Sequence, residues 1–330
     1  MLFSFISSFL AALISAYLLI RLAQPFGLIA EPGEHRKHTQ PTPLVGGIAI
    51  LFGLLVGTLL FASQWLLLLP SLVLLCIVGV LDDRFKLPSW TRFVAQAIAV
   101  LLMINLTGVQ LTGLGALVSA NEVILNRWSV PLTIFACIGV INAVNMSDGM
   151  DGLVGSLLIL VLLALLFSTQ ASASLIIIAI ASIAGFLVWN IRLFKSKAML
   201  FMGDAGSTVL GLLMAFLLIK STQAPLVEMP PVTALWYLAL PLFDAVTVLI
   251  LRPLRGQSPF SADRIHYHHL FTRVGLSVNQ ALLCILLIQA FFIGVGYFMN
   301  ANGIAQHYQF YGFLACFTLY FLFVMRRTNN

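Results

Sequence analysis

Charge is what this sequence lacks most. Only 8% of its 330 residues are charged and 61% are hydrophobic, whereas about 25% of a soluble domain is charged. This composition excludes an ordinary soluble domain and predicts an all-α polytopic membrane protein. Runs of about 17 to 25 apolar residues can cross a bilayer, and we expect about eleven such helices. They lie near residues 2–23, 44–62, 66–81, 93–107, 130–146, 153–169, 174–191, 205–219, 232–251, 278–298 and 308–325.

Three further absences narrow the class of protein. The four cysteines are single residues within apolar runs, which favours core residues over disulfides or metal ligands. Despite a net charge of +6 there is no Lys/Arg run interleaved with aromatics, so we expect no nucleic-acid partner. No repeat or linker interrupts the apolar runs, which predicts a single integral-membrane domain over residues 1–330.

The distribution of basic residues predicts the orientation in the membrane. No Lys or Arg precedes the first apolar run, and Arg21 follows it, which predicts an uncleaved first helix. Of the 17 Lys and Arg residues, only Arg127 and Lys220 fall on one set of alternating loops. The positive-inside rule therefore predicts an external N-terminus and a cytoplasmic C-terminus. Six aspartates also lie on the predicted cytoplasmic side: Asp82, Asp83, Asp148, Asp151, Asp204 and Asp263.

The stretch 142–152 is the most polar interruption between two apolar runs. Asp148 and Asp151 are three residues apart, so in a helical turn both point the same way. Asn145 adds an amide, and glycines 149 and 152 permit close approach of backbone to a ligand. An ordinary membrane turn is the alternative, since Asp and Gly are common there.

Two more carboxylate groups follow the same pattern at the ends of apolar runs. Asp82 and Asp83 are adjacent, and two like charges at about 6 Å repel by about 3 kcal/mol at an effective dielectric of about 20. A cation or a substrate proton relieves that repulsion, although a solvated pair with Arg84 and Lys86 is an equal alternative. Asp204 precedes an apolar run and either caps its helix or binds a metal.

Two cationic segments lie on the same predicted side. Lys37 and His38 could meet a phosphate or nucleotide, with a basic loop that only sets topology as the alternative. Gly46 and Gly47 follow and could let a helix end approach a ligand.

The second cationic segment consists of one arginine and three histidines. Arg264, His266, His268 and His269 are suited to binding a diphosphate. Three histidines also raise a zinc hypothesis, but the surrounding oxygen ligands favour Mg²⁺ or Mn²⁺. Asp244 lies inside an apolar run and is either functional or hydrogen-bonded to a neighbouring helix.

At these residues the sequence resembles the polyprenyl-phosphate N-acetylhexosamine-1-phosphate transferase superfamily over nearly its whole length. The matching motifs are Leu81-Asp-Asp-Arg-Phe85, Asn142-Ala-Val-Asn-Met-Ser-Asp-Gly-Met-Asp-Gly152, Phe201-Met-Gly-Asp-Ala-Gly-Ser207 and His266-Tyr-His-His269. Within the superfamily the lead-in to the histidine motif is most similar to the bacterial WecA-type branch. That branch transfers N-acetylglucosamine 1-phosphate from its UDP carrier to undecaprenyl phosphate.

The resemblance implies a role for each motif. Asp204 binds the catalytic Mg²⁺, with Asp151 sharing the metal or contacting the nucleotide, and Phe201 stacks on uracil. Asp82 and Asp83 handle the lipid phosphate. The remaining motif residues assist catalysis or bind the donor, and they are Asp148, Asn145, Arg264, His266, His268 and His269. The implied location is the bacterial inner membrane with a cytoplasmic active site, at the first membrane step of a surface polysaccharide such as O-antigen of lipopolysaccharide.

Several alternatives stay open at this stage. The donor could carry another N-acetylhexosamine or phospho-N-acetylmuramoyl-pentapeptide, and a UDP-sugar hydrolase would release UMP without a lipid. A secondary transporter is a rival from another class, but transporters place charged sites near the bilayer midplane, often within inverted repeats. We expect one-step displacement at phosphorus rather than a covalent aspartyl intermediate. A homodimer is compatible with the resemblance.

Overall fold

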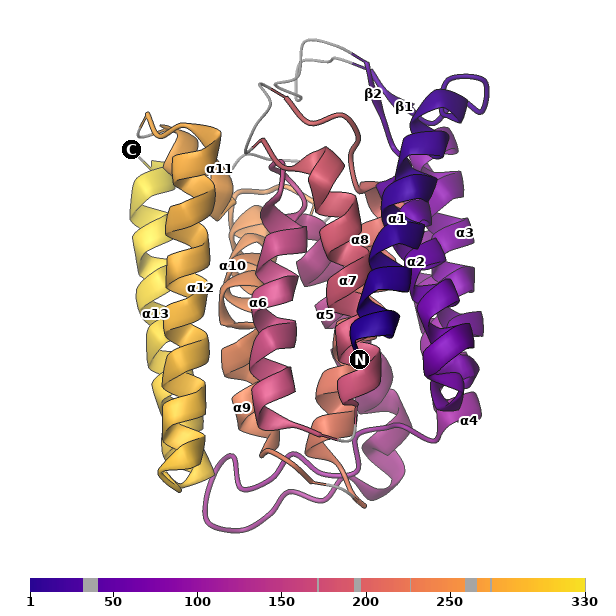
Figure 1. The fold of residues 1–330 in the computed structure, drawn as a ribbon. Helices are drawn as coiled ribbons and strands as arrows, with labels where there is room; N and C mark the ends of the chain where they lie inside the picture. Colours follow the sequence, from indigo (N-terminus) through magenta and orange to yellow (C-terminus); the bar gives the residue numbers. More distant parts are fainter. Residues whose placement is uncertain are drawn as a thin grey trace.

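The computed structural model of the chain describes residues 1–31, 41–170, 172–192, 197–225, 227–258, 266–273 and 275–329 (Figure 1). The long and medium helices are α1 (Leu2–Leu22), α2 (Gly46–Phe61), α3 (Leu69–Phe85), α4 (Ser89–Thr107), α5 (Ser129–Ser147), α6 (Leu153–Ser168), α7 (Ala173–Asn190), α8 (Gly203–Thr222), α10 (Ala239–Leu254), α12 (Val278–Ala301) and α13 (Gln306–Asn329). The short elements are α9 (Pro231–Tyr237), α11 (Tyr267–Arg273), two 3₁₀ turns (Ser63–Leu68 and Asn126–Trp128) and the antiparallel strands β1 (Ile29–Ala30) and β2 (Thr42–Pro43). The all-α prediction is confirmed.

The helices are long and apolar enough to make this a polytopic membrane protein. Within the described ranges eight helices pass a length and hydropathy criterion for crossing a bilayer, and the bent pair α9–α10 makes a ninth. The eleven predicted runs all fall on helices, but α2 and α6 are only 16 residues long. Sixteen residues extend about 24 Å, less than a hydrocarbon core of about 30 Å. Helix length therefore leaves the count of eleven crossings unconfirmed.

Helix α8 is the centre of the bundle. About 89% of the apolar stretch of this helix is buried inside the protein, compared with 22% for α1. It packs against α2, α3 and α5. Close approach is possible because α8 contains glycines: a Cβ on Gly211 would lie 2.6 Å from the Cα of Ile141 in α5. The residues at the N-terminus of α8 are thereby fixed by three neighbouring helices.

The beginning of α2 is joined to the segment that leads into α8. The amides of Gly46 and Gly47 donate to the carbonyls of Phe201 and Met202, at 3.0 and 2.9 Å. A Cβ on Gly47 would overlap the backbone of Gly206. The two glycines therefore bring α2 against protein backbone, whereas the sequence suggested an approach to a ligand.

The bend between α9 and α10 is braced by a buried glutamine. The two helices meet at 80°, which leaves backbone groups near Leu238 without helical partners. Gln289 of α12 is fully buried. Its amide donates to the carbonyl of Tyr237 at 2.8 Å and accepts from the amide of Leu240 at 3.2 Å. One side chain thus satisfies both sides of the bend.

The functional segments lie at one end of the bundle. In Figure 1 the β1–β2 hairpin, α11 and the C-terminus are at the upper end, and α1 runs from the N-terminus up to that end. Helices α3 and α5 finish at this upper end and α8 begins there. Because these three helix ends lie together, aspartates at or just beyond them can meet.

Candidate active site

A cavity of about 360 Å³ opens where these segments converge, and we name it the acidic cavity. Four of the predicted aspartates line it, together with cations, amides and one aromatic ring. Its polar and aromatic lining includes Asp83, Lys86, Asn145, Asp148, Asp151, Asn190, Arg192, Phe201, Asp204, His268 and His269. The sequence therefore predicted correctly that carboxylates separated by up to 121 residues gather at one place.

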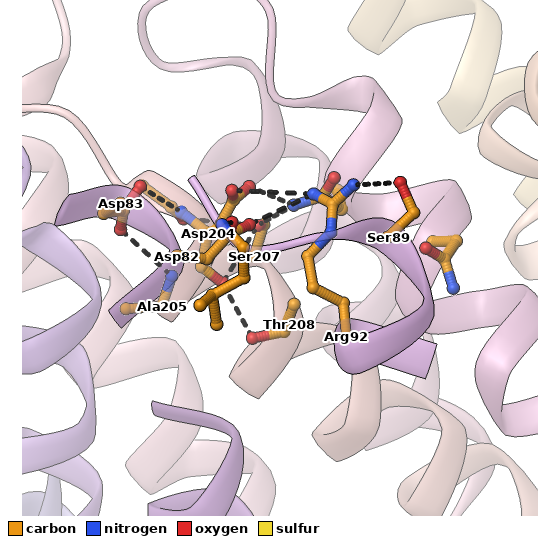
Figure 2. Close-up of polar contacts among 12 residues, drawn as sticks. Asp82, Asp83, Ser89, Arg92, Asp204, Ala205, Ser207 and Thr208 are labelled. Atoms are coloured by element: carbon orange, nitrogen blue, oxygen red, sulfur yellow. Dashed lines mark hydrogen bonds and ion pairs between the residues drawn. The ribbon is translucent and has the colours of Figure 1, made fainter. Parts of the chain in front are cut away.

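Asp83 caps α8 from a different helix. Its two carboxylate oxygens accept from the amides of Asp204 and Ala205, at 3.1 and 3.4 Å (Figure 2). No side chain adjacent in sequence caps α8, so an acceptor supplied by α3 satisfies these amides. Gly79 permits the approach, because a Cβ there would overlap the backbone of Ala205.

Asp204 lies in the first turn of α8 and is not the cap of that helix. Its Oδ1 accepts from the Asn145 side-chain amide at 2.6 Å, and the same amide donates to the Ser207 hydroxyl at 2.8 Å. The Asp204 side chain is 31% exposed. One carboxylate is thus held at the cavity wall and still accessible from the cavity.

Asp82 faces the other side of Asp204. It is buried, accepts from the amide of Leu87 at 2.7 Å, and pairs with Arg92 of α4 at 3.1 Å. The Arg92 guanidinium also lies 3.9 Å from Asp204 (Figure 2). Arg92, 37% exposed, is the cation that the sequence reasoning missed. Its position within the first turn of an otherwise apolar helix was the available signal.

A second, smaller recess lies beside this pair and is named the Arg92 recess. It has a volume of about 20 Å³ and shares Asn145 and Asp204 with the acidic cavity. Asn142 donates to Gln96 across it at 2.8 Å. Its polar lining consists of Asp82, Arg92, Gln96, Asn142, Asn145, Asp204 and Thr208. The two spaces therefore meet at one carboxylate and one amide.

Asp148 and Asp151 lie in a turn between α5 and α6 rather than on a helix, yet both line the cavity. Asp151 is nearly buried and forms an ion pair with Arg192, a second cation that the sequence reasoning missed. Burial raises the pKa of Asp148 to about 8, and the charges of Asp204, Asp83 and Asp151 contribute. A metal ion or a cationic group near Asp148 would oppose that rise.

Asn190 holds two loops of the site together. Its side chain accepts from the amide of Gly152 at 2.7 Å and donates to the carbonyl of Leu200 at 2.9 Å. Gly152 has φ +77°, a conformation that disfavours side chains. The turn with Asp151 and the segment with Phe201, which lines the cavity, are thereby fixed to each other.

The histidine segment contributes two residues to the cavity and one to a buried contact. His268 and His269 line the cavity. His266 instead hydrogen-bonds through Nδ1 to Asp244 at 2.6 Å. Asp244 is therefore bonded to a neighbouring element, which is one of the two alternatives that the sequence left open. Lys37, His38 and Arg264 lie outside the described residues.

The oxygen-rich lining fits a magnesium ion. Within the described ranges no three His, Cys, Asp or Glu side chains group into a site that could hold a metal alone. Mg²⁺ commonly binds through one or two carboxylates, waters and substrate phosphates, and the accessible carboxylate of Asp204 suits that mode. The same observation gives no support to a zinc site formed by the described histidines.

The fold and site define a class: a multi-pass membrane protein with a carboxylate-lined cavity at one end of its helical bundle. The sequence profile of glycosyl transferase family 4 matches residues 65–222. The chain is 35% identical over 301 residues to the undecaprenyl-phosphate α-N-acetylglucosaminyl 1-phosphate transferase of Salmonella typhi, covering 88% of this chain and 82% of that protein.

Two further relatives carry the same name. The Haemophilus influenzae protein is 35% identical over 98% of this chain and 92% of its own length. The Escherichia coli (strain K12) protein is 34% identical over 88% of this chain and 82% of its own length. The chain belongs to this family of glycosyl-1-phosphate transferases. The resemblance seen in the four motifs is thereby confirmed.

Proposed function

We propose that the protein transfers N-acetylglucosamine 1-phosphate from UDP-N-acetylglucosamine to undecaprenyl phosphate and releases UMP. The supporting observation is the acidic cavity, which gathers Asp83, Asp148, Asp151 and Asp204 at one end of a membrane bundle. The names of the relatives supply the substrates. A soluble donor and a lipid acceptor must meet at a membrane boundary, and this is the end at which the polar segments lie.

The donor is assigned to the acidic cavity. A diphosphate facing several carboxylates would be repelled, so we infer a bound Mg²⁺, with Mn²⁺ as a substitute, held by Asp204 and assisted by Asp151. When bound, the ion would neutralise the diphosphate and polarise its oxygens. Phe201 is assigned to the uracil ring. His268, His269 and Arg264 are assigned to the diphosphate, since protonated or neutral imidazoles and guanidinium groups donate to phosphate oxygens.

The acceptor phosphate is assigned to the Arg92 recess. Arg92 is half-exposed there, and Trp90 and Val94 of the same helix are exposed apolar residues that suit lipid. Asp82 fixes the guanidinium through its 3.1 Å contact. Of the two adjacent aspartates, Asp83 has both oxygens directed to α8 amides. We therefore assign Asp82 and Arg92, rather than Asp83, to the lipid phosphate.

The reaction is assigned to a one-step displacement. An oxygen of undecaprenyl phosphate attacks the β-phosphorus of the donor, the bond from that phosphorus to the bridging oxygen breaks, and UMP leaves. A phosphate monoester has a second pKa near 6, so the attacking group is already a dianion and needs no general base. Both oxygens of Asp82 and of Asp83 are hydrogen-bonded, which argues against a covalent aspartyl intermediate.

The orientation follows from the same assignment. We infer eleven crossings, an external N-terminus, and a cytoplasmic C-terminus and active site in the bacterial inner membrane. The support is that the loops at the end holding the cavity carry most of the Lys and Arg residues. The reaction would be the first membrane step toward a cell-surface polysaccharide, because it makes the lipid-linked sugar that later steps extend.

The purified protein is incubated in detergent with UDP-N-acetylglucosamine, undecaprenyl phosphate and Mg²⁺, and the amounts of UMP and of the lipid product are measured. We expect equal amounts of both products and none without lipid. UMP release without lipid would indicate a hydrolase, and no UMP with any UDP-sugar would refute the proposal. Parallel reactions with UDP-N-acetylgalactosamine and UDP-N-acetylmuramoyl-pentapeptide identify the sugar.

A further inference from the structure

Asp244 is a buried carboxylate that lies outside both the acidic cavity and the Arg92 recess. It is 1% exposed in α10. Its Oδ2 is hydrogen-bonded to Nδ1 of His266 at 2.6 Å. Its Oδ1 accepts from the amide of Tyr267 at 3.0 Å and from the hydroxyl of Tyr320 at 2.8 Å. One carboxylate therefore joins α10, the histidine segment and α13.

Packing alone gives no reason for a carboxylate at this position. A buried ion pair is often no more stable than an apolar replacement of similar volume. The contact with Asp244 does constrain the imidazole ring of His266. Asp244 accepts from two other donors, and pairing its remaining oxygen with an Nδ1–H of His266 would set the tautomer and the orientation of the ring.

The ring of His266 lies parallel to that of His268. Their centroids are 5.6 Å apart and their planes differ by 7°. His266 is 8% exposed and is not among the described residues that line the acidic cavity, whereas His268 lines it. His268 also abuts Gly149, where a Cβ would overlap the imidazole Nε2. A continuous set of contacts thus runs from Asp244 to the residue beside Asp148.

We propose that Asp244 and His266 are positioning residues that hold the His268 imidazole against Gly149, where it meets the diphosphate of the donor. His266 thereby acts through its neighbour instead of contacting substrate. This inference rests on the proposed transferase function for its substrate, but the arrangement of the three residues can be tested without it.

The first test replaces Asp244 by asparagine. Asn still accepts from the Tyr267 amide and the Tyr320 hydroxyl, but its amino group faces Nδ1 of His266 and favours the opposite tautomer. We expect kcat/KM for UDP-N-acetylglucosamine to fall about tenfold, as for other partners that orient a functional histidine. The KM for undecaprenyl phosphate should not change. Tyr320→Phe is the matched control, and it should lower kcat/KM less than threefold.

The second test asks whether the effect passes through His268. In a His268→Ala background, adding Asp244→Asn should cause no further fall in donor kcat/KM. In an Asp151→Asn background, the same substitution should still cause its full tenfold fall. A full fall in the His268→Ala background would overturn the inference, and so would equal changes in the KM values of donor and acceptor.

A third measurement does not depend on turnover. Diethyl pyrocarbonate modifies accessible imidazoles, and mass spectrometry reports the modification of His268. We expect Asp244→Asn to raise the modification rate of His268 at least threefold with an unchanged melting temperature, and Tyr320→Phe to leave it near wild type. An unchanged rate in Asp244→Asn overturns the inference. Absence of UMP from the wild-type protein instead refutes the proposed function, and this measurement still decides the positioning role.

Discussion

Replacing Asp83 by alanine should destabilise the protein as well as inactivate it. The substitution removes the acceptor for the amides of Asp204 and Ala205, of which Ala205 is 1% exposed. Each hydrogen bond to a charged acceptor contributes about 1.5–3 kcal/mol, so the pair contributes on the order of 3–6 kcal/mol. Removing one negative charge relieves repulsion of about 3 kcal/mol for two carboxylates some 6 Å apart. The difference is a net loss of up to about 3 kcal/mol.

The assay is thermal unfolding of the purified protein in detergent, with and without Mg²⁺. A net loss of this size corresponds to a fall in melting temperature of up to about 5 °C. The melting temperature of Asp83→Asn should fall less, because the side-chain carbonyl oxygen can still accept a hydrogen bond from one amide. Asp148→Asn is the matched control: it removes a carboxylate from the same cavity and should leave stability unchanged or higher. If Asp83→Ala melts at the same temperature as Asp148→Asn, the capping role of Asp83 is wrong.

Three other expectations follow. The pKa of Asp148 is raised from 3.8 to about 8, so between these pH values the folded metal-free protein holds a proton that the unfolded chain releases. The free energy of unfolding should therefore fall as pH rises from about 4 to 8, by up to about 1.4 kcal/mol per pH unit. Melting curves in EDTA should show this slope in the wild type and a flatter one in Asp148→Asn, and equal slopes would refute the assignment. Gln289→Leu should destabilise the protein by about 2–4 kcal/mol, since it leaves the Leu240 amide and the Tyr237 carbonyl unpaired at the bend. Its melting temperature is compared with that of Gln289→Glu, and an unchanged melting temperature in Gln289→Leu would show that Gln289 does not stabilise the bend. Asp204→Asn should abolish UMP release while membrane insertion and gel-filtration behaviour stay normal, and activity near wild type with Mg²⁺ would remove Asp204 from the metal role.

The sequence predicted the arrangement of helix ends well, because it depends on local properties. Apolar runs, alternating loop charge and the positive-inside rule place the aspartates of α3, α5 and α8 on one side before any packing is known. Asp83, Asp148, Asp151 and Asp204 do line one cavity. Their catalytic roles stay predictions, as do those of Asn145, Phe201 and the histidines.

What the sequence could not predict depends on contacts between distant segments. Asp83 and Asp82 look alike in the sequence. The approach of α3 to α8 gives Asp83 two amides, whereas α4 gives Asp82 an arginine. The partner of Asp244 lies 22 residues away, past a segment without an apolar pattern. The bend at Leu238 falls inside a continuous apolar run, so periodicity predicts one straight helix there.

Asn145 and Asp204 line both the acidic cavity and the Arg92 recess, and under the proposed substrate assignments this shared pair has a consequence for inhibition. A nucleotide mimic and a lipid-phosphate mimic would then bind in adjoining spaces that meet at this pair. Joining the two into one molecule requires a bridge that passes a single carboxylate–amide pair, so a short polar tether would gain the affinity of both halves.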